Sequence, residues 1–376
     1  MKGRGAWIGG VISKLLAVGL VAGVLGGSAD VGAQAPAAMK PQPKVRAAFV
    51  YVSPVGDGGW TFAHDQARKL TEKAFPDVLT TAYSEAVPEG AQAEQVIERY
   101  VRQGFNLIFT TSFGYMDPTL AVAKRHPETV FMHCSGFKTA ANMGTYFGRM
   151  YQARYLSGMV AGKTTKSHII GYVAAHPIPE VIRGIDAFTL GVRAVNPEAK
   201  VHVVWTSSWY DPPKEREAAE SLLDISADVI AQHQDTPGPQ QAAEKRGRYS
   251  IGYNSDMRAF APRAHLTAPI WHWEKIYTEI VKQVHDGTWK SGQLWPGLES
   301  GVVDLAPFNP IVPAEVQKLV DDKKAELIAK RWDVFTGPIK DQDGKVVVEA
   351  GKRMTDPEML SMNFFVEGVV GSLPKK

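Results

Sequence analysis

The sequence predicts an α/β protein made of two doubly wound lobes, and three observations lead to that prediction. Short apolar segments that suit buried strands alternate with amphipathic segments that suit helices. The alternation runs through two similar series, over residues 45–147 and 151–253. Hydrophobic residues make up 44% of the 376-residue chain, which is enough for two cores. Strands that alternate with helices at this spacing form parallel sheets covered on both faces.

The first series begins with an apolar run over residues 45–52, a predicted strand that the glycines at 56, 58 and 59 terminate. Helix spacing is clearest over residues 90–103, where Ala93, Ile97 and Val101 fall on one face. The same reasoning predicts helices over 61–75, 90–103 and 118–125, and strands over 79–84, 106–111, 129–134 and 143–147.

The second series repeats this order. It predicts helices over 151–164, 179–195, 214–226 and 240–246, and strands over 168–174, 201–206, 229–232 and 249–253. A strand over 266–271, a helix over 273–286, a strand over 297–305 and a polar amphipathic helix over 313–330 follow. In the tail, Asp343-Gly344 separates 337–339 from 346–348, which indicates a hairpin.

The N-terminus is typical of a secretory signal peptide over residues 1–33. Lys2 and Arg4 give a positive start, residues 15–25 are apolar, and a small-x-small pattern ends at Ala33. We therefore expect cleavage after Ala33 and export to the periplasm.

Two alternatives to this interpretation stay open. Cleavage after Ala35 also fits the pattern, but it leaves Pro36 beside the scissile bond. A membrane anchor would need a longer apolar run with fewer glycines. Residues 34–44 are rich in proline and are expected to form a linker.

Charge and cysteine content exclude several classes of protein. Without residues 1–33 the chain carries 39 Lys and Arg against 38 Asp and Glu, which gives no electrostatic reason to bind nucleic acid. Cys134 is the only cysteine, so no disulfide within the chain and no cysteine metal cluster can form. No cysteine follows the apolar run, so a lipid anchor of the lipoprotein kind is not expected.

The loops that follow the predicted strands are the expected place for a ligand, because open parallel sheets bind ligands beyond the carboxyl ends of their strands. These loops combine aromatic and hydrogen-bonding side chains: Trp60, Phe113, Tyr115, Trp209, Gln234, Asp235, Asn254 and Trp271. Aromatic faces stack on a flat ring, and amide or carboxyl groups read its polar edges. The other interpretation is that the tryptophans only pack the lobe interface.

Several segments make the chain resemble a known family. They include Gly58-Gly59-Trp60-Thr61-Phe62, Tyr155-Leu156-Ser157-Gly158-Met159-Val160-Ala161-Gly162 and Ile251-Gly252-Tyr253-Asn254-Ser255-Asp256. In their order and spacing these segments resemble the basic membrane protein (BMP) family of ABC-importer substrate-binding proteins, which is related to the bacterial purine nucleoside receptor. The resemblance covers about residues 45–335.

The resemblance implies a type I periplasmic binding protein fold, with two Rossmann-like lobes joined by a three-strand hinge. The lobes would comprise 45–148 plus 268–298 and 149–267 plus 299–336, with 337–376 as a hairpin and tail. The lobes would close around a solute. The expected protein is a monomer without a cofactor or metal, and its expected partners are ABC permease subunits in the inner membrane.

The resemblance also assigns residues. Trp60 and Trp209 fall where the nucleoside receptors place stacking aromatics. Asn254 falls where those receptors usually have an aspartate. Trp271 falls near the position where they have a lysine directed at the sugar. These two departures remove charge and fill space, so a free base such as adenine or hypoxanthine is favoured over a nucleoside.

Four further residues complete the expected site. We expect Asp235 and Gln234 to read the edge of the base, and Phe113 and Tyr115 to close the far wall. Plain packing of these four residues within their loops is the alternative.

Other functional classes fit less well. A periplasmic nucleoside hydrolase would need a general acid and base, usually with a metal. The chain contains neither His-Glu-x-x-His nor Gly-x-Ser-x-Gly. Its histidines at 133, 176, 233 and 272 lie near strand ends, which keeps a composite metal site open as a minor alternative. A DNA-binding repressor would need an N-terminal helix-turn-helix. A sensory role uses the same fold as transport, so the sequence does not separate the two.

Overall fold

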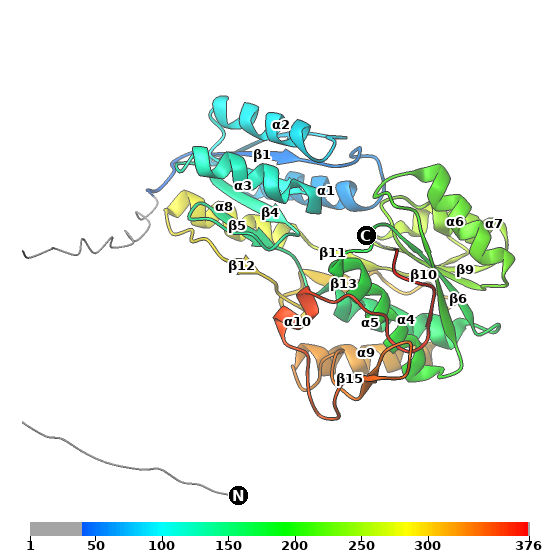
Figure 1. The fold of residues 1–376 in the computed structure, drawn as a ribbon. Coiled ribbons are helices and arrows are strands. Elements are labelled where there is room, and N and C mark those ends of the chain that lie inside the picture. The colour runs from blue at the N-terminus through cyan, green and yellow to red at the C-terminus, as the bar shows by residue number, and fades with distance from the viewer. Residues whose placement is uncertain (1–39, 375–376) are drawn as a thin grey trace, which may run out of the picture. The chain divides into compact units, whose positions relative to one another are not determined.

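The computed structural model describes residues 40–374. The predicted signal peptide and most of the proline-rich linker lie outside the described residues. The described chain forms two six-stranded sheets (Figure 1), and every strand pairing within them is parallel. The predicted α/β architecture is therefore confirmed.

The first sheet combines five strands from residues 45–146 with one strand from residues 293–294. These are β1 (Val45–Val50), β2 (Leu79–Ser84), β3 (Leu107–Thr111), β4 (Val130–Cys134), β5 (Met143–Tyr146) and β12 (Gln293–Leu294), in the spatial order β12-β5-β4-β3-β1-β2. Its helices are α1 (Trp60–Ala74), α2 (Ala91–Arg102), α3 (Met116–Arg125) and α8 (Glu274–Asp286). Helices α2 and α3 pack together, as do α1 and α8. The α2–α3 pair buries its own hydrophobic cluster against one face of the sheet.

The second sheet repeats this plan. Its strands are β6 (Ile169–Ala174), β7 (Lys200–Trp205), β8 (Val229–His233), β9 (Tyr249–Ile251), β10 (His265–Thr267) and β16 (Val369–Val370), in the order β10-β9-β8-β6-β7-β16. Its helices are α4 (Met150–Thr164), α5 (Pro179–Val195), α6 (Pro212–Asp224) and α7 (Gly238–Lys245). Helix α4 packs on α5, and α6 on α7. In each sheet the first strand lies between the second and the third, which is the doubly wound arrangement.

The chain crosses between the sheets three times: after β5, after β10 and after β12. At the second crossing, the prediction of one continuous strand over 266–271 is wrong. The structure divides it into β10 and β11 (Pro269–Trp271), because the chain leaves the second sheet there. Strand β11 pairs antiparallel with β13 (Val303–Leu305), the only regular strand within the predicted 297–305 strand.

The C-terminal segment contains more structure than its pattern indicates. The predicted helix and hairpin are present as α9 (Ala314–Ile328), β14 (Ile339–Lys340) and β15 (Val346–Val348). Helix α10 (Asp356–Leu360) and β16 follow, and β16 joins the edge of the second sheet beside β7. Asp186 of α5 accepts a hydrogen bond of 3.0 Å from the backbone N–H of Val366. Across residues 40–374, no helix has the length and apolar character needed to cross a membrane.

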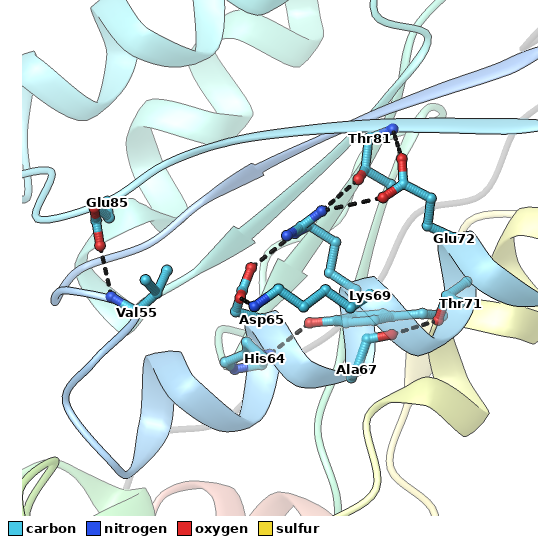
Figure 2. Close-up of polar contacts among 11 residues, drawn as sticks. Val55, His64, Asp65, Ala67, Lys69, Thr71, Glu72, Thr81 and Glu85 are labelled. Carbon is cyan, nitrogen blue, oxygen red and sulfur yellow. Dashed lines mark hydrogen bonds and ion pairs between the residues drawn. The ribbon is translucent and has the colours of Figure 1, made fainter.

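Polar contacts fix α1 against β2 (Figure 2). Arg68 donates to Asp65 at 2.8 Å and to the hydroxyl of Thr81 at 2.6 Å. Glu72 accepts the backbone N–H of Thr81 at 2.8 Å, and Lys69 forms an ion pair with Asp65 at 2.8 Å. Helix α1 begins at Trp60, so these contacts also hold the helix that carries that tryptophan.

Candidate ligand-binding site

A cavity lies between loops at the carboxyl ends of the two sheets. The first lobe contributes Val52, Trp60, Ser112, Phe113 and Ser135, and the second contributes Glu180, Trp209, His233, Asp235 and Tyr253. The cavity therefore lies where open parallel sheets bind their ligands.

Trp60 is held firmly in the wall of the cavity. Asp57 accepts the backbone N–H groups of Gly59 at 2.8 Å and Thr61 at 2.9 Å, so its carboxyl group caps the start of α1. The indole N–H of Trp60 donates to the carbonyl of Thr111 at 2.7 Å. With both the backbone and the ring anchored, the side chain is 8% exposed.

Glu215 of α6 joins the two loops that carry Trp209 and Asp235. Its carboxyl group accepts the backbone N–H of Asp211 at 3.0 Å and that of Thr236 at 3.2 Å. The backbone N–H of Asp235 donates to the carbonyl of Trp209 at 3.3 Å. Burial raises the pKa of Glu215 to about 7. These bonds fix the spacing of Trp209 and Asp235 along the cavity wall.

Asp235 is the most unusual group in the cavity wall. Its side chain is buried, and Oδ2 has no hydrogen-bond partner among residues 40–374. Burial raises the pKa of Asp235 well above its ordinary value, and the nearby carboxyl groups of Asp57 and Glu215 raise it further. A neutral carboxyl group both donates and accepts, so Asp235 can pair with a ring edge of either kind.

Sequence reasoning missed Glu180, Ser135 and Tyr253, and treated His233 only as a metal candidate. His233 Nε2 lies 3.5 Å from Glu180 Oε1, and the hydroxyl of Ser135 donates to the other oxygen of Glu180. The ring of His233 lies 4.6 Å from that of Tyr253. Burial lowers the pKa of His233 to about 4, so its ring is neutral at neutral pH. The available signal was position, because Ser135 directly follows β4, His233 ends β8 and Tyr253 lies two residues after β9.

Asn254 and Trp271 do not line this cavity. They bind each other, with the indole N–H of Trp271 donating to Asn254 Oδ1 at 3.0 Å. Trp271 also stacks on Trp273 with ring centroids 4.1 Å apart. Asn254 and Trp271, the two residues that differ from the nucleoside-receptor pattern, are thus hydrogen-bonded to each other.

Gln234 and Tyr115 are also outside the cavity lining, and both are fully buried. Gln234 donates to the hydroxyl of Thr206 at 2.5 Å. The hydroxyl of Tyr115 donates to the carbonyl of Val87 at 2.5 Å. Of the eight residues expected at the site, the structure brings Trp60, Phe113, Trp209 and Asp235 together around one cavity.

The loops of the two lobes touch beside the cavity. The hydroxyl of Ser255 donates to the carbonyl of Gly58 at 2.6 Å. A Cβ atom at Gly59 would overlap the carbonyl of Asp235. This close approach is possible because Gly59 has no side chain. Within the described range, no three His, Cys, Asp or Glu side chains are grouped so that they could hold a metal ion.

Comparison with known proteins identifies the family. The model of the Bmp family, described as ABC transporter substrate-binding protein PnrA-like, matches residues 44–334. A purine-binding protein of Brucella abortus is 46% identical over 332 residues, 88% of this chain and 95% of that protein. A Haloferax volcanii protein, named as a candidate glucose-binding protein of an ABC transporter, is 42% identical over 330 residues, 88% of this chain and 81% of its own.

Solved structures support the same fold. An ABC transporter solute-binding protein from Conexibacter woesei superimposes with a TM-score of 0.64 at 24% identity, covering 77% of this chain and 98% of that one. A solute-binding protein from Aeropyrum pernix superimposes with a TM-score of 0.67 at 18% identity, covering 79% of this chain and 93% of that one. The predicted two-lobed binding protein, as opposed to a hydrolase, is confirmed by the family match. The chain belongs to the PnrA-like family of ABC transporter substrate-binding proteins.

Proposed function

We propose that this protein is the periplasmic purine-binding component of an ABC importer and that its ligand is a free base, adenine or hypoxanthine. The observation that carries this proposal is the cavity that Trp60 lines from one lobe and Trp209 from the other, with Asp235 in the same wall. A purine ring offers two flat faces for stacking and a polar edge for hydrogen bonds. The purine-binding relative, at 46% identity, supports the same ligand class.

One feature favours the base over the nucleoside. Asn254 and Trp271, which stand where the receptors have an aspartate and a sugar-directed lysine, satisfy each other through a 3.0 Å hydrogen bond. A ribose would therefore find neither of the charged groups that the receptors offer it.

The leader sequence supports the proposed export, and the family supports the proposed assembly. Residues 1–33 direct the chain to the periplasm, and the mature protein, a monomer, delivers its ligand to permease subunits in the inner membrane. The near-neutral mature charge fits a clamp that binds an uncharged ring.

Thermal unfolding of the mature protein against adenine, hypoxanthine, adenosine, inosine, cytosine and glucose tests this function. A ligand that binds only the folded state, at a hundred times its dissociation constant, adds about 2.7 kcal/mol to the stability. Stabilisation by adenine or hypoxanthine, with none by the nucleosides, is the expected result. Stabilisation by glucose alone would assign the ligand of the Haloferax relative to this chain and overturn the purine proposal.

Replacing Gly59 by alanine is expected to weaken ligand binding by about tenfold or more, equivalent to ~1.4 kcal/mol. The added Cβ would overlap the carbonyl of Asp235, so the two lobes could not approach as closely. Isothermal titration calorimetry with the best purine measures the effect. Gly56→Ala is the matched control, because a Cβ at Gly56 meets no atom within 4 Å. Equal affinities for both variants would show that closure does not depend on this contact.

A further inference from the structure

A second cavity adjoins the first. The two cavities share Glu180, His233 and Tyr253 as lining residues, so these side chains form the boundary between them. The remaining lining residues of the second cavity are Phe147, Met150, Tyr151, Arg154, Arg183 and Gly184. Neither of the two arginines lines the first cavity.

Arg154 is buried in the wall of this second cavity with most of its hydrogen-bonding capacity unused. Its side chain is 1% exposed, and its guanidinium lies 3.5 Å above the ring of Tyr253. Nη1 donates to the carbonyl of Gln232 at 2.6 Å. Nε and Nη2 have no partner in the part of the chain that the structure describes. A buried donor without a partner costs ~1–3 kcal/mol, and more when it is charged.

Three polar atoms without partners surround a single point next to Gly184. A Cβ built at Gly184 would lie 3.7 Å from Arg154 Nε, 3.7 Å from His233 Nδ1 and 3.8 Å from the hydroxyl oxygen of Tyr172. Among residues 40–374, none of these three atoms has a hydrogen-bond partner. Because position 184 is glycine, no side chain fills the space beside these three atoms.

The charges around this point favour an acceptor atom. Arg183 is buried in the same cavity wall, and among residues 40–374 its guanidinium donates one hydrogen bond, to the carbonyl of Met359 at 2.8 Å. Glu180 is the one carboxyl group in the lining. Arginine has five N–H donors and no acceptor, so a ligand group that itself donates cannot satisfy it.

We propose that the second cavity receives a carbonyl oxygen of the ligand, so that the protein prefers oxopurines such as hypoxanthine over aminopurines such as adenine. This inference rests on the proposed function and selects between its two candidate bases. The oxygen of hypoxanthine accepts from the N–H groups of Arg154, whereas the amino group of adenine would place donor against donor. A site built to pair with one polar group rejects an analogue that lacks it, because the buried partners are left without a hydrogen bond.

The test compares the affinities of hypoxanthine, adenine and unsubstituted purine by isothermal titration calorimetry. The proteins are the wild type, Gly184→Ala and the control Gly292→Ala, whose added Cβ meets no atom within 4 Å. The methyl group at 184 fits without a clash but occupies the space beside Arg154, His233 and Tyr172. The wild type should bind hypoxanthine at least about tenfold more tightly than adenine. Gly184→Ala should lose about tenfold in hypoxanthine affinity, as expected for a lost charge-assisted hydrogen bond.

For adenine and unsubstituted purine, Gly184→Ala should resemble the wild type, and Gly292→Ala should do so for every ligand. Wild-type binding of adenine as tight as that of hypoxanthine would overturn the oxopurine inference and leave the purine function standing. An equal loss for all three ligands in Gly184→Ala would also overturn the inference, because the cavity would then not recognise the oxygen. If the wild type bound no purine, the proposed function would fall together with the inference.

Discussion

Replacing Gly191 by alanine is expected to destabilise the second lobe strongly. Gly191 lies on α5 where that helix crosses α4, and a Cβ there would overlap the backbone carbonyl of Tyr155. The same holds from the other side, because a Cβ at Gly158 of α4 would overlap the backbone carbonyl of Phe188. The two helices therefore touch backbone to backbone, and an added methyl group can be accommodated only by moving one helix.

The cost of such a movement is large relative to the total stability. Overpacking of a close-packed interior typically costs ~1–3 kcal/mol and occasionally more, and here the overlapping atoms belong to the backbone, which can give way least. A typical domain is stable by only ~5–15 kcal/mol. Gly191→Ala should therefore yield insoluble protein, or protein whose unfolding midpoint falls by many degrees, as measured by circular dichroism.

Gly184→Ala on the same helix is the matched control. The nearest atom to a Cβ at Gly184 lies 3.7 Å away, so alanine fits there, and its higher helix propensity adds roughly 1 kcal/mol. The two substitutions change helix propensity equally, and their difference isolates the overlap with α4. A Gly191→Ala protein that unfolds at the same temperature as Gly184→Ala would contradict the close crossing of α4 and α5.

Replacing Trp209 by alanine is expected to reduce purine affinity by between about thirtyfold and a thousandfold. Loss of a buried apolar face costs ~1.5–3 kcal/mol, to which stacking adds roughly 0.5–1.5 kcal/mol. Stability should change little, because Trp209 is only half-buried and its recorded aromatic contacts are edge-on to His176 at 4.8 Å and tilted to His233 at 6.3 Å. Isothermal titration calorimetry and thermal unfolding separate the two effects.

Trp205→Ala controls for the loss of a tryptophan from the same lobe. Trp205 does not line the cavity, and its indole N–H donates to the carbonyl of Ser372 at 3.0 Å. It should lower the stability and leave the affinity unchanged. Trp60→Ala should lower both, because its ring is 8% exposed and truncating a buried tryptophan costs ~3–5 kcal/mol. Unchanged purine affinity in Trp209→Ala would place the ligand elsewhere.

The sequence by itself determined the two parallel sheets and the loops in which a site would lie. Alternation of apolar runs with helical spacing is a local property, so it can be read without knowing any tertiary contact. The rule that ligands bind beyond the carboxyl ends of strands then selected Trp60, Phe113, Trp209 and Asp235, which the structure gathers around one cavity.

The tertiary structure alone decided which neighbouring side chains face that cavity. Asn254 and Trp271 are hydrogen-bonded to each other, and Gln234 and Tyr115 are fully buried outside the cavity lining. Strands β12 and β16 have two residues each, too few for any period to show in the sequence. The side chains that meet at Gly184 come from positions 154, 172 and 233. A contact between residues so far apart in the chain depends on how the helices and strands pack, which no local pattern records.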